Sequence, residues 1–445
     1  MKKFLALMLA LCMVFALCAC GQTAAAPATE AAPAAEAAPA EEAAPAEATE
    51  ITLWTYPIGG WGNSDTVDAL MADFEAATGI KVNVEYLDYT NGDDQVNTAL
   101  EGNAAPDLIM EGPERLVANW GAKGYMVDIA DLWDDADKSE VNASCVSACF
   151  TSDGKCYEYP VVMTAHCMAV NYDKLVEAGA DQYIDLDTHT WTTEDFKNAV
   201  AALYAKYGDT VASIFCAGQG GDQGTRAIIN NMYGGTFTDE AHTKYTADDP
   251  ANIKALEELA AMDGITFDAS IVGGDEINLF RQGILKMAFC WNIAQQLNTD
   301  NNDAELTNDG DKIVFMSFPA EDGNAKLCGG IWGFGIFDNG DDAKVAAAKE
   351  FIKYFCDGDG TAAAVKAANY FAVRDNAGGN DISGIWADNE IMNEYNKLMP
   401  YLGDYYQVTT GWAEARTAWW NMLQQIGAGA DVTEAVTAFC EAANG

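Results

Sequence analysis

The most constraining feature of this sequence is a strand, a helix and a second strand that follow one another directly within residues 51–86. Residues 51–56 alternate in polarity and are rich in β-formers, which predicts a strand. Apolar residues at helical spacing across 64–77, with Gly79 just beyond, predict a helix, and residues 80–86 alternate again. Strands joined through a helix pair in parallel, so the chain is predicted to be an α/β protein.

The same alternation of elements continues to the end of the chain. Further strands are predicted at 107–110, 157–172, 211–216, 284–291, 313–318 and 331–337, and helices at 92–102, from about 224, and at 194–207, 250–262, 342–356, 388–399, 413–426 and 431–443. This number of elements exceeds one compact unit. We therefore predict two α/β lobes with several chain crossings: lobe 1 at 51–160 with a returning segment at about 313–340, and lobe 2 at 161–312 with a returning segment at about 341–445.

The first 20 residues predict export and a lipid anchor. Lys2 and Lys3 precede an apolar run too short for a comfortable membrane span, as in a secretory signal. The run ends in Leu17-Cys18-Ala19-Cys20, which resembles the bacterial lipobox, whose cysteine is diacylated. Two acyl chains on Cys20 satisfy the requirement for stable membrane attachment. Cleavage without acylation, or an uncleaved anchor, is the alternative.

A low-complexity segment separates the predicted anchor from the predicted fold. Residues 21–50 consist almost entirely of Ala, Pro, Glu and Thr, and recurrent prolines interrupt any helix. We predict a semi-extended tether of roughly 60–80 Å, at ~3.1 Å per residue. The folded part then begins at Ile51.

Charge and residue usage exclude several classes of function. The chain carries 24 Lys and Arg against 68 Asp and Glu, so a nucleic-acid partner is not expected, because phosphate binding needs clustered cations. Three scattered histidines give no metal or triad spacing. Nine cysteines remain after Cys20, without paired spacings, so we expect buried thiols and neither a disulfide framework nor a metal site. No cofactor is expected.

Several segments, in order, resemble the extracellular solute-binding proteins of the maltose-binding type, known as solute-binding family 1. The similar segments are 51–54 (ITLW), 74–82, 105–109 (APDLI), 120–129, 154–160, 170–175, 190–196, 280–288 and 347–352. The resemblance implies a two-lobed periplasmic-binding-protein fold of type II, with crossing strands at the hinge and a ligand cleft between the lobes. It also implies a monomeric, non-enzymatic receptor that serves the permease of an ABC importer.

Candidate ligand residues in lobe 1 follow predicted strands, because ligands of open α/β sheets bind at the carboxyl ends of strands. Tyr56 and Trp61 flank a glycine-rich loop whose backbone a ligand can approach closely, and Glu111 follows the third strand. Aromatic faces suit the C–H surfaces of sugars, and a carboxylate accepts hydrogen bonds from hydroxyls.

The remaining candidates come from the resemblance and from polar loops. They are Thr164 on the hinge strand, Asp222 and Gln223 in a glycine-rich loop, Trp291, Gly330, Trp332, Arg374 and Trp412. Arg374 is equally expected to bridge the two lobes. His166 is expected to be a satisfied core histidine.

These residues predict a carbohydrate ligand, and two alternatives stay open. A polyamine or other small cation is suggested by Glu111, Asp222 and the acidic charge. A secreted glycoside hydrolase needs two suitably spaced carboxylates, which 68 acids supply by chance. A phosphorylated ligand is disfavoured because none of the five arginines cluster at strand ends.

Overall fold

The computed structural model describes residues 49–89, 91–218, 222–297 and 305–445. The predicted signal, Cys20 and residues 21–48 lie outside this part of the chain. Ala48–Gly445 form one compact unit, within which two sheets mark two lobes. In the described residues, no helix has the length and apolar character needed to cross a membrane.

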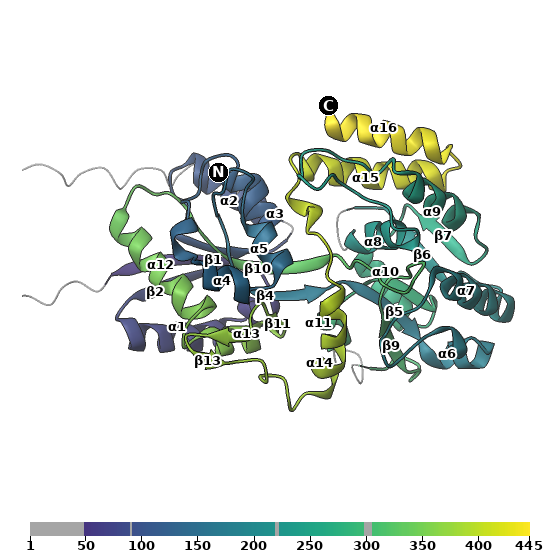
Figure 1. The fold of residues 1–445 in the computed structure, drawn as a ribbon, viewed down its shortest axis with the longest axis horizontal. Coiled ribbons are helices and arrows are strands. Elements are labelled where there is room, and N and C mark those ends of the chain that lie inside the picture. The colour runs from purple at the N-terminus through teal and green to yellow at the C-terminus, as the bar shows by residue number, and fades with distance from the viewer. Residues whose placement is uncertain (1–48, 90, 219–221, 298–304) are drawn as a thin grey trace, which may run out of the picture. The chain divides into compact units, whose positions relative to one another are not determined.

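The sheet of lobe 1 has six strands in the order β11-β4-β10-β3-β1-β2 (Figure 1). The strands are β1 (Glu50–Thr55), β2 (Lys81–Tyr86), β3 (Leu108–Glu111), β4 (Tyr159–Ala165), β10 (Gly329–Ile336) and β11 (Phe371–Ala372). β1 pairs in parallel with β2 and β3, whereas β10 runs antiparallel to β3 and β4. The parallel part is the unit that the sequence predicts.

Helix α1 (Ser64–Thr78) forms where the apolar spacing places it. The side chain of Asn63 accepts a hydrogen bond from the Thr66 N–H and caps the helix, and Gly79 ends it at φ 75°. The buried face includes Phe74, whose ring meets that of Phe351 on α12 (Asp342–Cys356) at 5.2 Å. Burial of this apolar face holds α1 and α12 to the sheet.

Lobe 2 contains an antiparallel sheet and a parallel pair of strands. The sheet has the order β8-β5-β9, from β8 (Met287–Trp291), β5 (Cys167–Asn171) and β9 (Ile313–Met316). The pair is β6 (Ala212–Phe215) with β7 (Ile265–Asp268). The helices that contact these strands include α8 (Gln223–Met232), α9 (Pro250–Ala261), α10 (Gly273–Arg281) and α15 (Trp412–Gly427).

Short elements and outer helices complete the two lobes. They are α2 (Gly92–Glu101), α3 (Pro113–Arg115), α4 (Asp135–Glu140), α5 (Ala143–Cys149), α6 (Tyr172–Ala178), α7 (Thr193–Tyr207), α11 (Ile293–Gln296), α13 (Thr361–Ala368), α14 (Glu390–Tyr395), α16 (Val432–Asn444), β12 (Asn376–Ala377) and β13 (Asn380–Asp381). 3-10 turns lie at η1 (Gly59–Gly62), η3 (Ala130–Leu132), η4 (Asp181–Tyr183), η5 (Asn396–Tyr401) and η6 (Tyr406–Val408), and η2 (Leu116–Gly121) is a π-helical segment.

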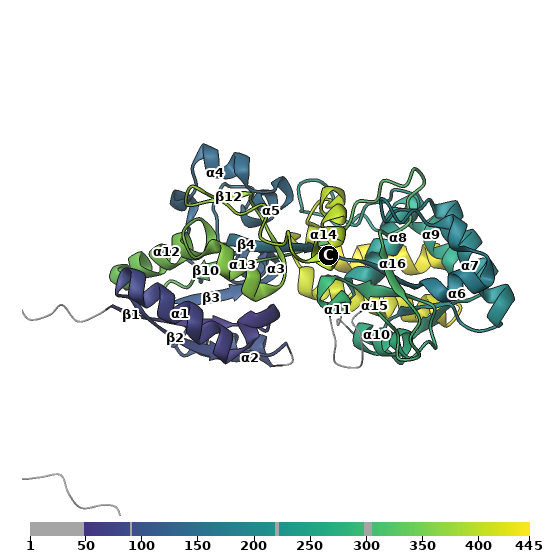
Figure 2. The same ribbon diagram turned by 90° about the horizontal axis from the view of Figure 1, so that it is seen from below.

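The chain crosses between the lobes at three places, and the bounds differ from those predicted. β4 leads into β5 through His166 alone, and β10 leads back beside β4 (Figure 2). The predicted return at 313–340 begins too early, because β9 pairs with β5 in lobe 2. Residues 342–372, predicted in lobe 2, belong to lobe 1, where α12 and α13 pack on its strands and β11 pairs with β4. Leu402 bridges to Leu327 where the C-terminal segment passes the hinge.

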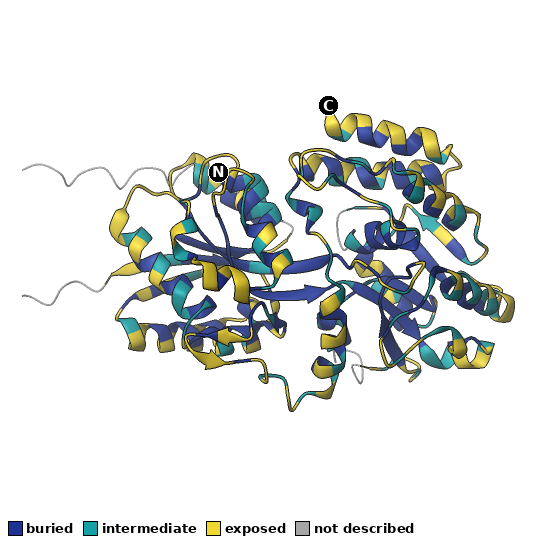
Figure 3. Cartoon of the chain, viewed as in Figure 1, coloured by how far each residue is buried: buried dark blue, intermediate teal, exposed yellow. Residues whose placement is uncertain are grey.

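The crossing strands form the most buried part of the structure (Figure 3). Every residue of β4 is buried, and in β10 only Trp332 keeps part of its surface exposed. The pairing register of β10 shifts between Trp332 and Gly333. Such a bulge re-aims a side chain, and here it coincides with the one partly exposed residue of the strand.

Candidate functional site

An aromatic pair lies at the ends of strands β1 and β2. Tyr56 directly follows β1, and its ring stacks on that of Tyr89 with centroids 5.1 Å apart. Tyr56 is fully buried and donates a hydrogen bond to Asp93 at 2.5 Å, whereas Tyr89 is 53% exposed. Gly92 leaves room for the Tyr56 ring, because a Cβ there would lie 2.7 Å from it. The fixed inner ring thus supports an outer ring that faces solvent.

Glu111, the last residue of β3, is buried with half of its carboxylate unused. Arg115 donates to Oε1 of Glu111 at 3.0 Å, and Oε2 is buried without a partner among the described residues. Burial, together with the negative charge of Glu114, raises the pKa of Glu111 to about 8 against the opposing effect of Arg115. An unpaired buried oxygen of this kind is a hydrogen-bonding position that a ligand can fill.

A second aromatic pair joins Trp332 of the neighbouring strand β10 to Tyr370, which directly precedes β11. The ring of Trp332 stacks on that of Tyr370 at 4.7 Å and 18°. Gly330 makes this possible, since a Cβ at that position would lie 2.3 Å from the indole. Gly330 is therefore part of the site through the placement of Trp332. We call Tyr89, Glu111, Arg115, Trp332 and Tyr370 the lobe-1 face.

In lobe 2, Asp222 holds two arginines together. It accepts hydrogen bonds from Arg226 at 2.6 and 3.4 Å, and from Nε and Nη2 of Arg416 at 3.0 and 2.9 Å. Burial alone would raise the pKa of Asp222, but the two guanidinium groups outweigh it and lower the pKa to about 2. We call Asp222, Arg226 and Arg416 the lobe-2 face.

This pairing corrects two expectations. Arginines do cluster near a strand end, because Arg226 and Arg416 meet although they lie far apart in sequence. Asp222 was expected to bind ligand hydroxyls directly. Instead, both of its carboxylate oxygens accept hydrogen bonds from the two arginines. Its geometry supports a role in positioning Arg416. Gln223, the first residue of α8, is half-buried and stays a prediction.

His166 occupies the crossing between β4 and β5 and does not behave as a core histidine. It is half-buried, and the described residues offer its ring no hydrogen bond. Burial and the positive charge of Arg226 lower its pKa to about 4, so the ring is neutral at pH 7. The nearby charges of Arg226 and Asp222 place His166 beside the lobe-2 face.

Charges of the two lobes act on each other across the crossing strands. The positive charge of Arg416 in lobe 2 contributes to lowering the pKa of Asp93 in lobe 1, together with Arg115 and against the effect of burial. Tyr405 of the C-terminal segment donates a hydrogen bond to Glu114 of lobe 1 at 2.6 Å. Helix α3, which ends at Arg115, contacts η6, and Tyr406 of η6 accepts a hydrogen bond from Arg226 at 3.4 Å, so the lobe-1 and lobe-2 faces are near neighbours.

Two expected aromatic residues lie in the hydrophobic core. Trp61 is fully buried between Phe334 and Phe355, and its indole N–H donates to the carbonyl oxygen of Ala364 at 3.2 Å. Trp291 is 1% exposed, and its N–H donates to Gln296 at 2.9 Å. This burial does not fit a ligand contact, so we leave both out of the site.

The glycine-rich loop next to Trp61 also packs inward. A Cβ on Gly59 would lie 1.9 Å from the carbonyl oxygen of Ala368 on α13, and the residue has φ 54°. The glycine-rich loop that was expected to allow close approach of a ligand therefore allows close packing of helix α13. Thr164 on β4 is fully buried as well, with its hydroxyl donating only to the Ala165 carbonyl among the described residues.

Arg374 neither bridges the lobes nor faces a ligand. Its guanidinium donates to Asp137, Asp357 and the Tyr159 hydroxyl, all in lobe 1, at 3.2, 2.5 and 2.9 Å. The side chain is 1% exposed. Its role is structural, because it ties α4, the end of α12 and β4 together.

Trp412 lies beside the lobe-2 face but is covered. The guanidinium of Arg226 lies 4.7 Å from its ring centroid, and the rings of Phe237 and Tyr406 are both 5.9 Å away. Trp412 is 5% exposed, and its indole N–H is buried without a partner in the described structure. The ring supports Arg226 in this conformation.

Sequence reasoning missed Tyr89, Arg115, Tyr370 and Arg416. Tyr89 follows strand β2, so the strand-end rule that selected Tyr56 also applied to it. Arg416 lies four residues after Trp412 in a predicted helix, a spacing that places the two side chains on one helix face, whereas Arg115 lies in the short segment that directly follows the third strand. Tyr370 carried no such signal, because its partner Trp332 is distant in sequence.

The described part of the chain contains neither a cluster of metal ligands nor a disulfide. No group of three His, Cys, Asp or Glu side chains there could hold a metal ion. The nine cysteines are unpaired, and all except Cys290 are buried. Burial raises the pKa of these thiols, as for Cys145, which makes them unreactive.

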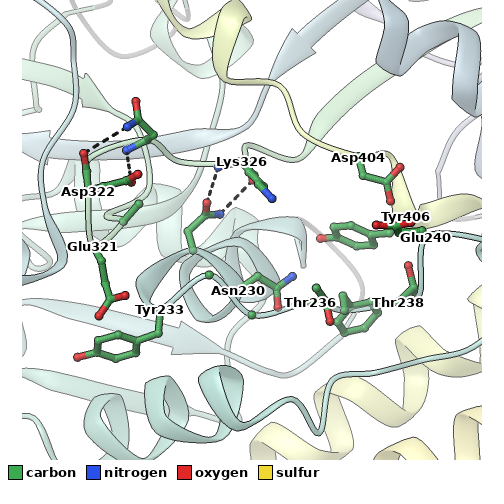
Figure 4. Close-up of a pocket in the computed structure, with 16 residues that line it drawn as sticks. Asn230, Tyr233, Thr236, Thr238, Glu240, Glu321, Asp322, Lys326, Asp404 and Tyr406 are labelled. Atoms are coloured by element: carbon green, nitrogen blue, oxygen red, sulfur yellow. Dashed lines mark hydrogen bonds between the residues drawn. The ribbon is translucent and has the colours of Figure 1, made fainter.

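One cavity lies next to Arg226 of the lobe-2 face, because two of its lining residues, Phe237 and Tyr406, contact that guanidinium (Figure 4). It has a volume of about 680 Å³ and is lined by the segment after α8, by residues near 320–326, and by Asp404 and Tyr406. A second cavity of about 520 Å³ lies around His189 and Phe315. None of the expected ligand residues lines either cavity, so we assign the candidate site from the two faces.

Solved structures share this architecture at low sequence identity. The GacH receptor of Streptomyces glaucescens, solved unliganded and with acarbose, superposes with a TM-score of 0.69 at 17% identity, covering 88% of this chain and 97% of that one. The cyclic alpha-maltosyl-1,6-maltose binding protein of Arthrobacter globiformis gives 0.70 and 18%, covering 89% and 98%. Maltose-bound MalE3 of T. maritima gives 0.65 and 16%, covering 89% and 99%. These likenesses confirm the periplasmic-binding-protein fold.

A search of curated protein sequences gave no match. The sequence profile of a family described as bacterial extracellular solute-binding protein matches residues 69–394, which is more than half of the chain. Two lobes, crossing strands and polar clusters on both lobes are the parts of a binding receptor. The protein belongs to the bacterial extracellular solute-binding protein family and is a solute-binding receptor, not an enzyme.

Proposed function

We propose that the protein is a lipid-anchored receptor that captures a carbohydrate between its lobe-1 and lobe-2 faces and delivers it to the permease of an ABC importer. The observation that carries the proposal is the unpartnered Oε2 of Glu111 beside two stacked aromatic pairs. A sugar hydroxyl supplies the missing donor, and the exposed Tyr89 ring offers an apolar face to the C–H surface of a pyranose.

The polar groups opposite this face suit the same ligand. Arg416, whose guanidinium is held by Asp222, brings a positive charge to this face, and neutral His166 is both a donor and an acceptor. In lobe 1, Arg115 pairs with Asp93, Glu111 and Glu114, and in lobe 2 Asp222 pairs with two arginines. The excess positive charge of the lobe-2 face repels cations, which favours a neutral, hydroxyl-rich ligand over a polyamine.

Similar structures add support of a weaker kind. GacH was solved with acarbose and MalE3 with maltose, and the Arthrobacter globiformis protein is a cyclic alpha-maltosyl-1,6-maltose binding protein. The anchor at Cys20 and the permease partner rest on the lipobox-like end of the signal and on the family resemblance. A tethered receptor beside a membrane permease is the arrangement that these two features require.

Titration calorimetry with a panel of mono- and oligosaccharides tests the ligand class, with spermidine as the cationic competitor. We expect at least one sugar to bind with one site per chain, and Glu111→Met to weaken it. Glu158→Met is the matched control, because Glu158 is another fully buried lobe-1 glutamate with unpaired oxygens. Spermidine binding without sugar binding would select the cationic ligand instead.

A further inference from the structure

The third crossing segment, residues 401–409, is fixed to the residues that lead into strand β10. The Gly403 N–H donates to the carbonyl of Leu327 at 2.9 Å. Farther along the segment, the side-chain amide of Gln407 donates to Sγ of Cys328 at 3.4 Å. We call residues 401–409 the connector. These hydrogen bonds hold its backbone against a crossing strand, so the side chains between them project from a fixed support.

Two neighbouring tyrosines of the connector reach opposite lobes. The hydroxyl of Tyr405 donates to Oε2 of Glu114 in lobe 1 at 2.6 Å, and Tyr405 is buried. The hydroxyl of the next residue, Tyr406, accepts a hydrogen bond from Nε of Arg226 in lobe 2 at 3.4 Å. The connector therefore contacts both lobes within two consecutive residues.

From Tyr405, a chain of polar contacts leads to Glu111. Oε1 of Glu114 lies 3.5 Å from Nη1 of Arg115, and the same nitrogen donates to Oε1 of Glu111 at 3.0 Å. One guanidinium nitrogen is thus shared by two carboxylates. The Glu114 carboxylate is also confined, because a Cβ on Gly112 would lie 2.7 Å from its Oε2. Without the donor from Tyr405, Glu114 would draw the guanidinium away from Glu111.

We propose that Tyr405 is a positioning residue that acts on the carboxylate of Glu111 from the connector. By holding Glu114, it keeps the guanidinium of Arg115 available to Glu111. The proposal rests on the function proposed above, in which Glu111 meets the ligand. Because Tyr406, the next residue, contacts the lobe-2 face, the same connector supports both faces.

The charges around Glu111 give the sign of the expected effect. Burial raises the pKa of Glu111, and Arg115 opposes this rise. Glu114 from α3 and Asp93 from α2 add to it. A weaker hold by Arg115 therefore raises the pKa of Glu111 further. Further titratable groups that interact with Glu111 are uncharged at pH 7, because burial raises the pKa of each: Glu158, Tyr56, Tyr89 and Tyr370.

Infrared spectroscopy of the carboxyl band tests the proposal in the full chain without any ligand, with the Glu111→Gln chain subtracted as the reference. Tyr405→Phe removes the hydroxyl and keeps the ring. We expect the titration midpoint of Glu111 to rise by about half a pH unit, or about threefold in proton affinity. Tyr395→Phe is the matched control, because Tyr395 is fully buried and its hydroxyl donates to the Ala165 carbonyl at 2.8 Å. It should leave the midpoint unchanged.

Changes at Glu114 separate a positioning role from a general loss of packing. Glu114→Met removes a negative charge and leaves Arg115 to Glu111, so the midpoint should fall. In the Glu114→Met chain, Tyr405→Phe should have no further effect, because the hydroxyl has no carboxylate to hold. Circular dichroism verifies that each variant is folded. An unchanged or lower midpoint in Tyr405→Phe, or the full rise in the Glu114→Met chain, would overturn the proposal.

Calorimetry with the sugar that binds most tightly separates this proposal from the function on which it rests. Sugar binding is expected to need the ionised carboxylate, so Tyr405→Phe should raise the Kd at pH 7 about threefold. If the midpoint rises but no sugar binds, Tyr405 positions Glu111 and the proposed ligand class is wrong. If sugars bind but the midpoint stays unchanged, the proposed function stands and the role of Tyr405 is refuted.

Discussion

Arg115 donates a hydrogen bond to one carboxylate oxygen of Glu111 at 3.0 Å, while the other oxygen of Glu111 is buried and unpartnered in the described structure. The guanidinium also binds Asp93 at 2.7 Å and lies over the rings of Tyr56 and Tyr89. One arginine thus orients the carboxylate and supports the aromatic pair, so that the open oxygen and the exposed ring belong to one preorganised surface.

Removal of the Glu111 carboxylate is expected to weaken sugar binding. Glu111→Met keeps an unbranched side chain of similar length but no acceptor, so the Kd measured by calorimetry should rise about tenfold or more, as for the loss of a hydrogen bond to a carboxyl group. Glu158→Met should leave the Kd unchanged. Equal Kd values for wild type and Glu111→Met would remove Glu111 from the site.

Sugar affinity is expected to depend on pH through Glu111. Its pKa is raised to about 8, chiefly by burial, so the free receptor holds a proton there at pH 7. A sugar hydroxyl that donates to Oε2 stabilises the ionised carboxylate of Glu111, so sugar binding releases the proton. The sugar affinity should therefore rise from pH 6 to pH 8 and level off above pH 8. Glu111→Gln should make the profile flat. A profile that is the same in both proteins would contradict the assignment.

Loss of the Asp222 carboxylate is expected to destabilise lobe 2. Asp222→Asn leaves Arg226, which is fully buried, without its charged partner, and the free energy of unfolding in urea should fall by about 3 kcal/mol. Asp404→Asn, which alters an exposed pair with His242, should change it little. If Asp222→Asn abolished binding at full stability, Asp222 would contact the ligand directly.

Arg374 is expected to matter for stability and not for ligand affinity. Arg374→Met removes the buried guanidinium that Asp137, Asp357 and the Tyr159 hydroxyl share and leaves the two carboxylates with Lys353 alone, so the free energy of unfolding should fall by about 2 kcal/mol. The Kd of the folded protein should be that of wild type, as measured by calorimetry after a folding check. If Arg374→Met raised the Kd for the sugar and left the free energy of unfolding unchanged, Arg374 would contact the ligand, as the sequence predicted.

Lipid attachment is expected at Cys20 and not at Cys18. Metabolic labelling with an alkynyl fatty acid should mark the wild-type chain and a Cys18→Ser variant, and should fail for Cys20→Ser. The Cys20→Ser chain should also leave the membrane fraction. Labelled Cys20→Ser protein would show that the anchor lies elsewhere.

The fold was largely predictable from local patterns. The strand, helix and strand of residues 51–86 fall within one or two residues of β1, α1 and β2, because alternation, helical apolar spacing and Gly79 all act locally. The residues at which the chain passes between the lobes were not predictable, because residues 313–316 and 331–337 have the same strand-like pattern. Pairing of β9 with β5, and of β10 with β3 and β4, separates them.

The candidate site was only partly predictable for a related reason. Tyr56, Glu111 and Trp332 follow from strand ends and the family resemblance. Whether a tryptophan faces a ligand or the core depends on distant partners, and Trp61 is buried by Phe334 and Phe355, which lie almost 300 residues away in sequence. Asp222 likewise meets Arg416 only in three dimensions.

A crystal structure of the protein with the sugar that binds most tightly in the panel tests the central claim most directly. We predict a sugar hydroxyl within hydrogen-bond distance of Oε2 of Glu111, with a ring against Tyr89 or Trp332 and Arg416 on the opposite side. A sugar bound elsewhere, with Oε2 of Glu111 still unpartnered, would contradict the account.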